Sequence, residues 1–325
     1  MHAVSSLPSL PEAVSTPLGA EVYRGLTTRP KKLSPWVFYD ERGSELFERI
    51  TELPEYYLTR TERGIFEADG EAILAAADAQ ELAIIELGAG TAAKTEVLLG
   101  AAVRTQRRVT YYPIDIAASA LDEAARRIGA NLPEVRVEPR VSDFLRDLGK
   151  LPAPGCRRMV LYIGSSIGNF EPDKANALLR RVRQQLAAGD LLLLGADHVK
   201  DRGTLLRAYN DSAGVTAEFN RNALCRLNRE LGAKFRPRLF RHRAVWNERE
   251  CRVEMHLESL ISQEVQIPSL RLNIPFRRGE SIHTENCYKF TRERVAEMLE
   301  RSGFSVEQSW TDAKRWFGVY LARVA

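Results

Sequence analysis

A glycine-rich turn directly after an aliphatic segment is the first candidate for ligand chemistry. Residues 86–91 read Glu-Leu-Gly-Ala-Gly-Thr. Glycine lets a ligand approach the backbone closely and adopts φ angles that other residues avoid. The turn lacks the third glycine of the dinucleotide fingerprint, because Ala93 occupies that position and Lys94 follows it. Taken alone, the turn is also compatible with a tight connection between a strand and a helix.

Acidic residues end the next two predicted strands and extend this candidate site. Asp115 can accept hydrogen bonds from ribose hydroxyls, and Asp143 from an adenine amino group, with Phe144 packed near the base. Lys94 can contact a methionine carboxylate or be a solvated helix lysine. The set fits S-adenosylmethionine better than a pyrophosphate nucleotide, because a sulfonium cofactor has no phosphates to cradle. We therefore predict that Gly88, Lys94, Asp115, Asp143 and Phe144 bind this cofactor.

Only a parallel sheet brings these residues to one edge, and the sequence predicts such a sheet. Strand-like and helical segments alternate through short loops, which indicates βαβ units. The predicted strands are 82–87, 109–115, 135–141, 158–163 and 190–196, and the predicted helices are 43–53, 61–77, 92–100, 117–130 and 173–187. After a stretch with helices at 201–210 and 216–231 and strands at 238–246, 251–262, 264–267 and 283–290, a helix at 292–301 and strands at 305–311 and 316–323 close the chain. This ending is typical of the class I methyltransferase fold, a Rossmann-like, doubly wound α/β sheet.

The pattern predicts three parts of the chain. Residues 1–20 are rich in Ser, Pro and Ala and are expected to form a flexible tail. Residues 61–196 with 286–325 are expected to form the S-adenosylmethionine-binding methyltransferase domain. Residues 21–60 with 197–285 are expected to form an α+β substrate-binding domain over the carboxyl edge of the sheet, where ligands of open α/β sheets bind.

Composition excludes several classes of protein. The 325 residues are 44% hydrophobic and 28% charged, which is ordinary for a globular protein and excludes disorder or collagen for most of the chain. No apolar run approaches the roughly 18 residues of a membrane span, and no signal peptide is visible. The four cysteines and five histidines have no metal-binding spacing, so we predict no metal. We expect a cytoplasmic monomer with no membrane partner.

The net charge of +4 is weak support for a nucleic-acid partner, which usually requires a clustered basic face. The densest basic run, residues 234–243, is expected to be an exposed strand edge, where charge blocks aggregation. We therefore predict no nucleic-acid partner.

The chain resembles the histidine Nα-methyltransferases of ergothioneine biosynthesis from about residue 21 onward. The matching stretches are 34–47, 54–62, 86–94, 164–170 and the closing hairpin. The most specific are Tyr-Asp-x-x-Gly-Ser at 39–44 and Glu-Tyr-Tyr-x-x-Arg-x-Glu at 55–62. The resemblance implies conversion of L-histidine to Nα,Nα,Nα-trimethyl-L-histidine (hercynine) by three methyl transfers, each of which leaves S-adenosyl-L-homocysteine.

The resemblance also implies roles for individual residues. Asn169 corresponds to the residue that binds the amino and carboxylate end of the substrate, and Tyr209 to one that holds the carboxylate. The other matches are Tyr39 near the α-amine, Tyr56 near substrate and cofactor, Glu285 on the imidazole and Met255 beside the ring; Tyr39 and Asn169 are the expected catalytic residues. Without the resemblance, the tyrosines and Met255 could be packing residues, Asn169 a helix N-cap and Glu285 a salt-bridge partner.

One position departs from the family pattern and leaves alternatives open. Many members have Glu-x-Ser where this chain has Glu285-Asn286-Cys287. A thiol is a weaker hydrogen-bonding group than a hydroxyl, so Cys287 predicts looser histidine recognition or compensation by Asn286. The first alternative substrate is another aromatic amino acid or amine, such as the prenylated tryptophan of ergot pathways. The others are a nucleic-acid methyltransferase, whose double-proline loop is missing at 168–172, and a non-catalytic cofactor-binding module.

Overall fold

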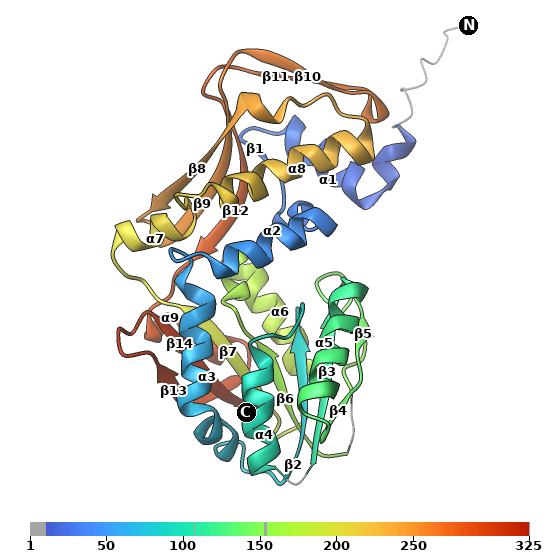
Figure 1. Ribbon diagram of the computed structural model, residues 1–325. Coiled ribbons are helices and arrows are strands. Elements are labelled where there is room, and N and C mark those ends of the chain that lie inside the picture. Colours follow the sequence, from blue (N-terminus) through green and yellow to red (C-terminus); the bar gives the residue numbers. More distant parts are fainter. Residues whose placement is uncertain (1–10, 107, 153–154, 325) are drawn as a thin grey trace, which may run out of the picture. The chain divides into compact units, whose positions relative to one another are not determined.

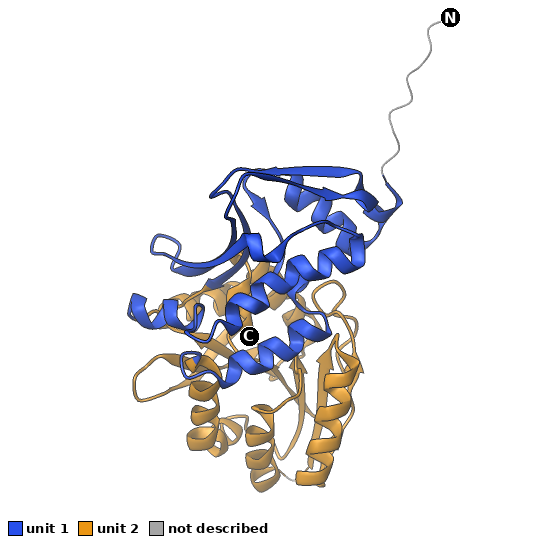
Figure 2. Cartoon of the chain, turned by 45° about the horizontal axis from the view of Figure 1, so that its top comes forward, with its two compact units in different colours: residues 1–56, 201–287 blue, residues 57–200, 288–325 orange. Residues whose placement is uncertain are grey.

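The computed structural model describes residues 11–106, 108–152 and 155–324 (Figure 1). The chain divides into two compact units, shown in different colours in Figure 2. Unit 1 comprises the chain up to Tyr56 together with Asp201–Cys287, and unit 2 comprises Tyr57–Lys200 with Tyr288–Ala325. The chain therefore passes from one unit to the other three times.

Unit 2 contains an eight-stranded sheet in the order β13-β14-β7-β6-β2-β3-β4, with β5 also paired to β3. The strands are β2 (Glu81–Leu87), β3 (Arg108–Asp115), β4 (Val135–Val137), β5 (Arg140–Val141), β6 (Arg157–Tyr162), β7 (Leu191–Asp197), β13 (Phe304–Thr311) and β14 (Phe317–Val324). Strands β2 to β7 pair in parallel, whereas β14 is antiparallel to β7 and β13 to β14. The order reverses between β2 and β6, and ligands of open α/β sheets bind at such a reversal. The predicted doubly wound class I fold is confirmed.

Helices cover both faces of this sheet. They are α3 (Tyr57–Ala75), α4 (Thr95–Thr105), α5 (Ala118–Asn131), α6 (Pro172–Gln185) and α9 (Arg292–Arg301), with a short 3-10 helix, η3 (Ser166–Asn169). Ile85 and Leu87 of β2 belong to one buried core with Leu179 of α6 and Leu299 of α9. Figure 1 shows α3 and α4 in front of the sheet, and these two helices pack together. Strand β2 is buried along nearly its whole length, as expected for a central parallel strand.

Two predicted elements of unit 2 have different limits from those expected. The strand predicted at 135–141 is broken into β4 and β5, because Pro139 has no N–H to donate to a neighbouring strand. The helix predicted at 92–100 begins at Thr95 and ends at Thr105, and Ala92, three residues before its start, has a positive φ of 55°.

Unit 1 contains two smaller sheets and several helices. One sheet has the order β1-β12-β9-β8, and β10 pairs with β11 in the other. The strands are β1 (Lys31–Lys32), β8 (Phe240–Asn247), β9 (Arg252–Ser259), β10 (Gln263–Ile267), β11 (Leu272–Phe276) and β12 (Ser281–Tyr288), and the helices are α1 (Pro17–Thr27), α2 (Glu41–Glu52), α7 (Arg202–Ala208) and α8 (Val215–Leu231), with 3-10 turns at Glu12–Ser15, Pro35–Phe38, Pro237–Leu239 and Pro268–Leu270. Strand β11 was not predicted. The last residue of β12 belongs to unit 2.

The basic run 234–243 leads into β8, which is the edge strand of its sheet. Arg241 and Arg243 are mostly exposed and form ion pairs with Glu258 of β9. The prediction of an exposed strand edge is confirmed.

The tail predicted at residues 1–20 is wrong for residues 12–20. A 3-10 turn covers Glu12–Ser15 and α1 begins at Pro17. The hydroxyl of Thr16 accepts a hydrogen bond from the N–H of Gly19 at 3.0 Å, and Leu18, Val22 and Leu26 are buried at helical spacing. The Ser, Pro and Ala content of this segment suggested a tail, although Thr16 followed by Pro17 is a helix N-cap signal. Residues 1–10 lie outside the described residues. Among the described helices, none has the length and apolar content needed to cross a membrane.

Candidate functional site

The glycine turn of unit 2 connects β2 to α4 and is in contact with Phe144. Gly88 and Gly90 have φ angles of 73° and 51°, in the left-handed region that favours glycine. The N–H groups of Gly88 and Ala89 both donate to the carbonyl of Ile114, at 2.8 and 3.2 Å. A Cβ atom at Gly88 would lie 3.6 Å from the Phe144 ring. Two of the predicted cofactor residues, Gly88 and Phe144, are therefore neighbours.

Asp115 joins the same group from the end of β3. Its two carboxylate oxygens accept hydrogen bonds from the N–H groups of Gly90 and Ala117, at 2.8 and 2.9 Å. A carboxylate has about four acceptor positions, so capacity remains for the hydroxyls of a ribose. Asp143 follows β5 and is half-buried, with Arg146 Nε 3.3 Å from its Oδ2. The glycine turn thus binds Asp115 through Gly90 and adjoins Phe144 at Gly88, with Asp143 next to Phe144 in the chain.

Lys94 forms an ion pair that the sequence did not predict. Its ammonium lies 2.5 Å from Oε2 of Glu62, a fully buried residue of α3. Glu62 also accepts from the N–H of Gly164, with 2.9 Å to each oxygen, and a Cβ at Gly195 would lie only 2.0 Å from Glu62 Oε1. Glu62 therefore connects α3 with Lys94 and with the loop after β6. The sequence analysis included Glu62 only as the last residue of the motif at 55–62 and assigned it no role. Its position within an amphipathic helix could have indicated a buried carboxylate.

A second buried carboxylate lies at the base of the glycine turn. Burial raises the pKa of Glu86 to about 7, and the hydrogen bond from Tyr111 and the charge of Lys94 oppose this shift. Tyr111 of β3 is itself buried and donates its hydroxyl to Glu86. Burial and the adjacent Glu86 raise the pKa of Tyr111. Glu86 and Tyr111 thus form a protonation-sensitive pair beneath the predicted cofactor residues.

Asn169 ends η3, immediately after the loop that follows β6. The loop contains Ser165 at a φ of 59°, and a Cβ at Gly168 would lie 2.7 Å from the carbonyl oxygen of Tyr288. The position of Asn169 is therefore restricted by tight backbone packing. The residue that precedes α6 is Glu171, so the alternative role of Asn169 as the N-cap of this helix is wrong.

The three predicted substrate tyrosines lie in one aromatic cluster of unit 1, formed by Tyr39, Phe47, Tyr56, Tyr209 and Phe219. The ring centroids of Tyr56 and Tyr209 are 6.3 Å apart, and Phe47 lies 6.3 Å from Tyr56 and 5.9 Å from Tyr39. Phe219 is 5.7 Å from Tyr39 and 6.1 Å from Phe47. Tyr39 is 37% exposed, whereas Tyr56 and Tyr209 are buried.

Glu285 and Cys287 occupy β12 of unit 1 and are both buried. The thiol of Cys287 donates to Oε2 of Glu285 at 3.4 Å. Oδ1 of Asn286 accepts a hydrogen bond from Nε2 of His283 at 2.8 Å. Met255 is buried on the neighbouring strand β9, and its carbonyl accepts from Thr284 of β12 at 3.0 Å. The structure thus brings Glu285 and Cys287 into contact and places Met255 on the adjacent strand.

The predicted residues form one set in each unit. Gly88, Lys94, Asp115, Asp143, Phe144 and Asn169 belong to unit 2, and Tyr39, Tyr56, Tyr209, Met255, Glu285 and Cys287 belong to unit 1. The donor set of unit 2 fits S-adenosylmethionine: a glycine turn with left-handed φ angles, carboxylates at two strand ends, an aromatic ring and a lysine. Among the described residues, no group of three or more His, Cys, Asp or Glu could hold a metal ion.

The strand order, the reversal between β2 and β6 and the residues around the glycine turn define a class I S-adenosylmethionine-dependent methyltransferase. Residues 18–324 match the family described as histidine-specific, SAM-dependent methyltransferase. The chain belongs to this family, and the expected enzyme class, an S-adenosylmethionine-dependent histidine Nα-methyltransferase, is confirmed.

The chain is similar over nearly its whole length to several named methyltransferases. It is 43% identical over 311 residues to a histidine N-alpha-methyltransferase of Mycolicibacterium smegmatis, which covers 96% of each chain. It is 41% identical to the enzyme of the same name from Mycobacterium tuberculosis, which covers 94% of each. A 4-dimethylallyltryptophan N-methyltransferase of Claviceps purpurea is 26% identical and covers 96% of each.

Proposed function

We propose that this chain methylates the α-amine of L-histidine three times, giving hercynine in ergothioneine biosynthesis, with unit 1 binding the amino acid and unit 2 the cofactor. The observation that carries the proposal is the aromatic cluster. It unites Tyr39, Tyr56 and Tyr209 in a unit that also holds the Glu285–Cys287 pair. Histidine recognition requires groups that bind the amino acid head group, here the tyrosines, and a group that accepts from the imidazole, here the carboxylate.

Unit 2 supplies the groups for S-adenosylmethionine. Asp115 would accept from the ribose hydroxyls, Asp143 and Phe144 would contact the adenine, and Gly88 would allow close approach of the backbone. Lys94, already held by Glu62, would bind the methionine carboxylate. When bound, the cofactor supplies an electrophilic methyl group on a sulfonium. No protein nucleophile is therefore needed, and the protein contributes mainly alignment, which can provide several kcal/mol of the rate enhancement.

The attacking amine must be neutral, because an ammonium has no lone pair. Free α-amines titrate near pH 8, so a neutral fraction exists without a strong base. Tyr39 would relay the released proton to solvent or orient the nitrogen, and Asn169 would orient the amino and carboxylate end. Tyr209 would hold the carboxylate. Tyr39 is partly exposed, which suits a role in proton release because a released proton must reach solvent.

The aromatic cluster also suits the product. Each methyl transfer enlarges the head group, and the third leaves a permanent cation. Aromatic faces attract quaternary ammonium groups by about 0.5–2 kcal/mol without requiring a hydrogen bond. Tyr56, in contact with both Phe47 and Tyr209, would form part of a pocket wall that tolerates the growing group.

Selection for the imidazole would come from β12 and its neighbour. Glu285 would accept from one ring N–H, a charge-assisted bond of roughly 1.5–3 kcal/mol. Cys287 would contact the second ring nitrogen, and Met255 would flank the ring. We further propose a monomer that acts in the cytoplasm and needs no metal.

Mass spectrometry of reaction products tests the proposal. The protein is given S-adenosylmethionine and a pool of all standard amino acids with tryptamine-like amines. We expect mono-, di- and trimethylated histidine and no other methylated amino acid. Trimethylation of a different amine, with histidine unchanged, would contradict the proposed substrate.

A second candidate is N-methylation of another aromatic amino acid or amine. It is favoured by Cys287, since a thiol binds an imidazole more weakly than a hydroxyl does. If histidine is the substrate, Cys287→Ser should lower the KM for histidine about fivefold, equivalent to about 1 kcal/mol. Cys225→Ser, the same change at an exposed cysteine, should leave this KM unchanged. An unchanged KM in Cys287→Ser would favour the second candidate.

A further inference from the structure

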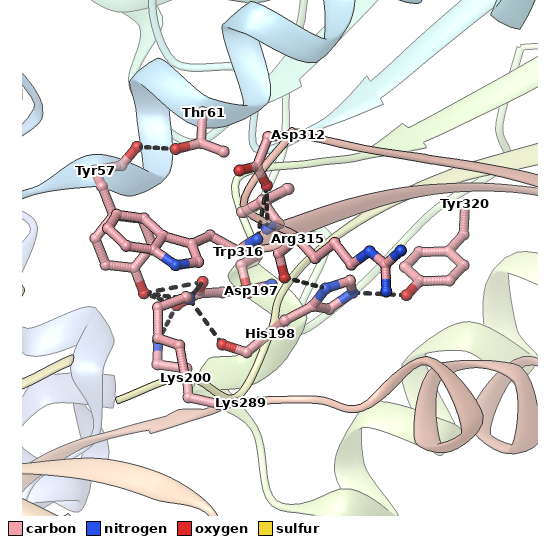
Figure 3. Close-up of polar contacts among 12 residues, drawn as sticks. Tyr57, Thr61, Asp197, His198, Lys200, Lys289, Asp312, Arg315, Trp316 and Tyr320 are labelled. Atoms are coloured by element: carbon pink, nitrogen blue, oxygen red, sulfur yellow. Dashed lines mark hydrogen bonds and ion pairs between the residues drawn. The ribbon is translucent and has the colours of Figure 1, made fainter. Parts of the chain in front are cut away.

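The chain passes between the units after Tyr56, Lys200 and Cys287, and all three passages adjoin one buried cluster of unit 2. The cluster consists of Tyr57, Asp197, Lys200 and Lys289, shown in Figure 3. Tyr57 is the first unit 2 residue after the first passage, Lys200 the last before the second, and Lys289 the second after the third. Segments distant in sequence therefore converge at the points where they leave unit 2.

Asp197 is the centre of this cluster. It is the last residue of β7 and is fully buried. The hydroxyl of Tyr57 lies 3.0 and 2.7 Å from its two carboxylate oxygens. Lys200 forms an ion pair with one oxygen, and Lys289 with the other at 2.9 Å. One carboxylate thus binds a side chain from each of the three passages.

Further contacts make the cluster rigid. The ammonium of Lys200 donates to the Tyr57 hydroxyl and to the His198 carbonyl, both at 2.7 Å, and it lies 4.3 Å from the centre of the Tyr57 ring. The backbone of two passages is also joined, because Phe290 N–H donates to the Asp197 carbonyl at 2.9 Å. The N–H of Asp197 donates to Ser165 Oγ at 2.9 Å, in the loop that leads to Asn169.

The cluster buries two lysines and one aspartate, whereas packing alone would favour apolar side chains. The side chains of Lys200 and Lys289 are at most 4% exposed, and both share the single carboxylate of Asp197. Burial lowers the pKa of Lys200 to about 8, against the attraction of Asp197. Apolar residues of the same volume are often at least as stabilising as a buried ion network, and in some proteins such a network serves to select one geometry. Such a network suits a role in orientation more than a role in stability.

At two of the three passages, residues proposed to bind histidine lie directly beyond unit 2, and beyond the passage after Lys200 the next such residue is Tyr209. Tyr56 precedes Tyr57, and Cys287 precedes Tyr288, with Glu285 two residues earlier on the same strand. An anchor at the end of each passage sets the direction in which the backbone of these residues leaves unit 2. A misplacement of about 1 Å can lower a rate about 100-fold.

We infer that Asp197, with Tyr57, Lys200 and Lys289, is a positioning site for the methyl-transfer reaction that orients the histidine-binding residues through the three chain passages. Asp197 touches neither substrate nor cofactor in this role. The inference rests on the proposed function of Tyr56, Glu285 and Cys287.

The test compares Asp197→Asn with Asp190→Asn. Asp190 is a matched control because it is also a buried carboxylate paired with a buried cation, Arg158. It lies directly before the first residue of β7, at the end opposite to Asp197, and adjoins none of the passages. For each variant we would measure the thermal midpoint, the Kd of S-adenosylhomocysteine by calorimetry, and kcat and KM for histidine. Activity of the unmodified chain on histidine is measured first, so that failure of the proposed function is recognised separately.

We expect Asp197→Asn to lower kcat/KM for histidine by about tenfold or more, with the Kd of S-adenosylhomocysteine within about threefold of the unmodified chain. Asp190→Asn should lower the thermal midpoint and leave kcat/KM for histidine nearly unchanged. Equal losses of histidine turnover in both variants, or a parallel loss of cofactor-product affinity in Asp197→Asn, would overturn the inference, as would unchanged kinetics. If Asp197→Asn does not fold, Tyr57→Phe, which removes one hydroxyl and no charge, is judged by the same criteria.

Discussion

At the scale of single residues, the protonation of Glu86 is the feature with the clearest thermodynamic consequence. This carboxylate is the penultimate residue of the hydrophobic strand β2, and it is buried next to the glycine turn. Its pKa of about 7 in the folded chain exceeds the ordinary value of 4.5. The folded state therefore holds a proton that the unfolded state has already released in the intervening pH range. Stability from this residue is complete below about pH 4.5 and is lost as the pH rises to about 7.

Replacing Glu86 by glutamine should remove this pH dependence. Gln keeps the size of the side chain and an oxygen that can accept from Tyr111. The free energy of unfolding of the unmodified chain should fall relative to Glu86→Gln between pH 4.5 and 7, by on the order of 3 kcal/mol in total. Denaturant titrations at pH 5, 6, 7 and 8 measure the difference. A difference between the two chains that stays constant over this range would show that the pKa of Glu86 is not raised.

At the scale of elements, the backbone of η3 and the end of β12 are packed against each other within unit 2. The added Cβ at Gly168 would lie 2.7 Å from the Tyr288 carbonyl oxygen and 3.4 Å from its nitrogen. Both neighbours are backbone atoms, so neither can move aside by a change of rotamer. Glycine at 168 is therefore required by close approach and not by its φ angle. Asn169 is the next residue, so this contact also restricts its position.

Gly168→Ala should disturb both stability and catalysis. Overpacking of this kind lowers the free energy of unfolding by about 1–3 kcal/mol, and the shift of η3 should displace Asn169 and lower kcat for histidine. The control is Gly129→Ala in α5, where nothing lies within 4 Å of the added Cβ; this change should stabilise the chain by about 0.5–1 kcal/mol. Chemical denaturation and steady-state kinetics compare the two. Wild-type kcat in Gly168→Ala would argue against a catalytic role of Asn169.

At the scale of the whole molecule, the prediction to be tested is the number of copies in solution, and the exposed apolar residues are its starting point. The most exposed large ones in the described part are Ile116 and Val141, at 64% and 60%. Ile116 follows Asp115, and Val141 lies two residues before Asp143, so both adjoin residues proposed to bind the cofactor. The edge strand β8 carries Arg241 and Arg243, and charge on an edge opposes pairing with another chain.

We therefore expect a monomer of 36.6 kDa in solution. Size-exclusion chromatography with light scattering should give this mass at low and high protein concentration, with and without S-adenosylhomocysteine. A mass near twice this value that persists on dilution would show an interface that the apolar surface did not reveal.

The local sequence determined most elements and the cofactor chemistry of this protein. Aliphatic runs predict parallel strands, and helical spacing predicts α9 at its observed limits, because both signals lie within a few neighbouring residues. The order of Gly88, Asp115 and Asp143 at successive strand ends indicated S-adenosylmethionine, since parallel strands end at one edge. The Nα-methylation of histidine came from resemblance to a family and not from such local rules. Composition gave a wrong prediction at residues 12–20, because the burial of Leu18, Val22 and Leu26 along α1 outweighs the polar, proline-rich appearance of its first residues.

Only the tertiary structure decided which distant side chains meet. Glu62 and Lys94 are separated by 32 residues, and Tyr57 and Asp197 by 140, so no periodicity could relate them. The grouping of Tyr39, Tyr56 and Tyr209 depends on Phe47 and Phe219, which local sequence rules treat as ordinary core residues. Burial also changes chemistry that composition cannot reveal, because the pKa of Glu86 depends on the water excluded around it. Sequence spacing thus determines which groups the chain carries, while long-range packing determines their partners and their charge.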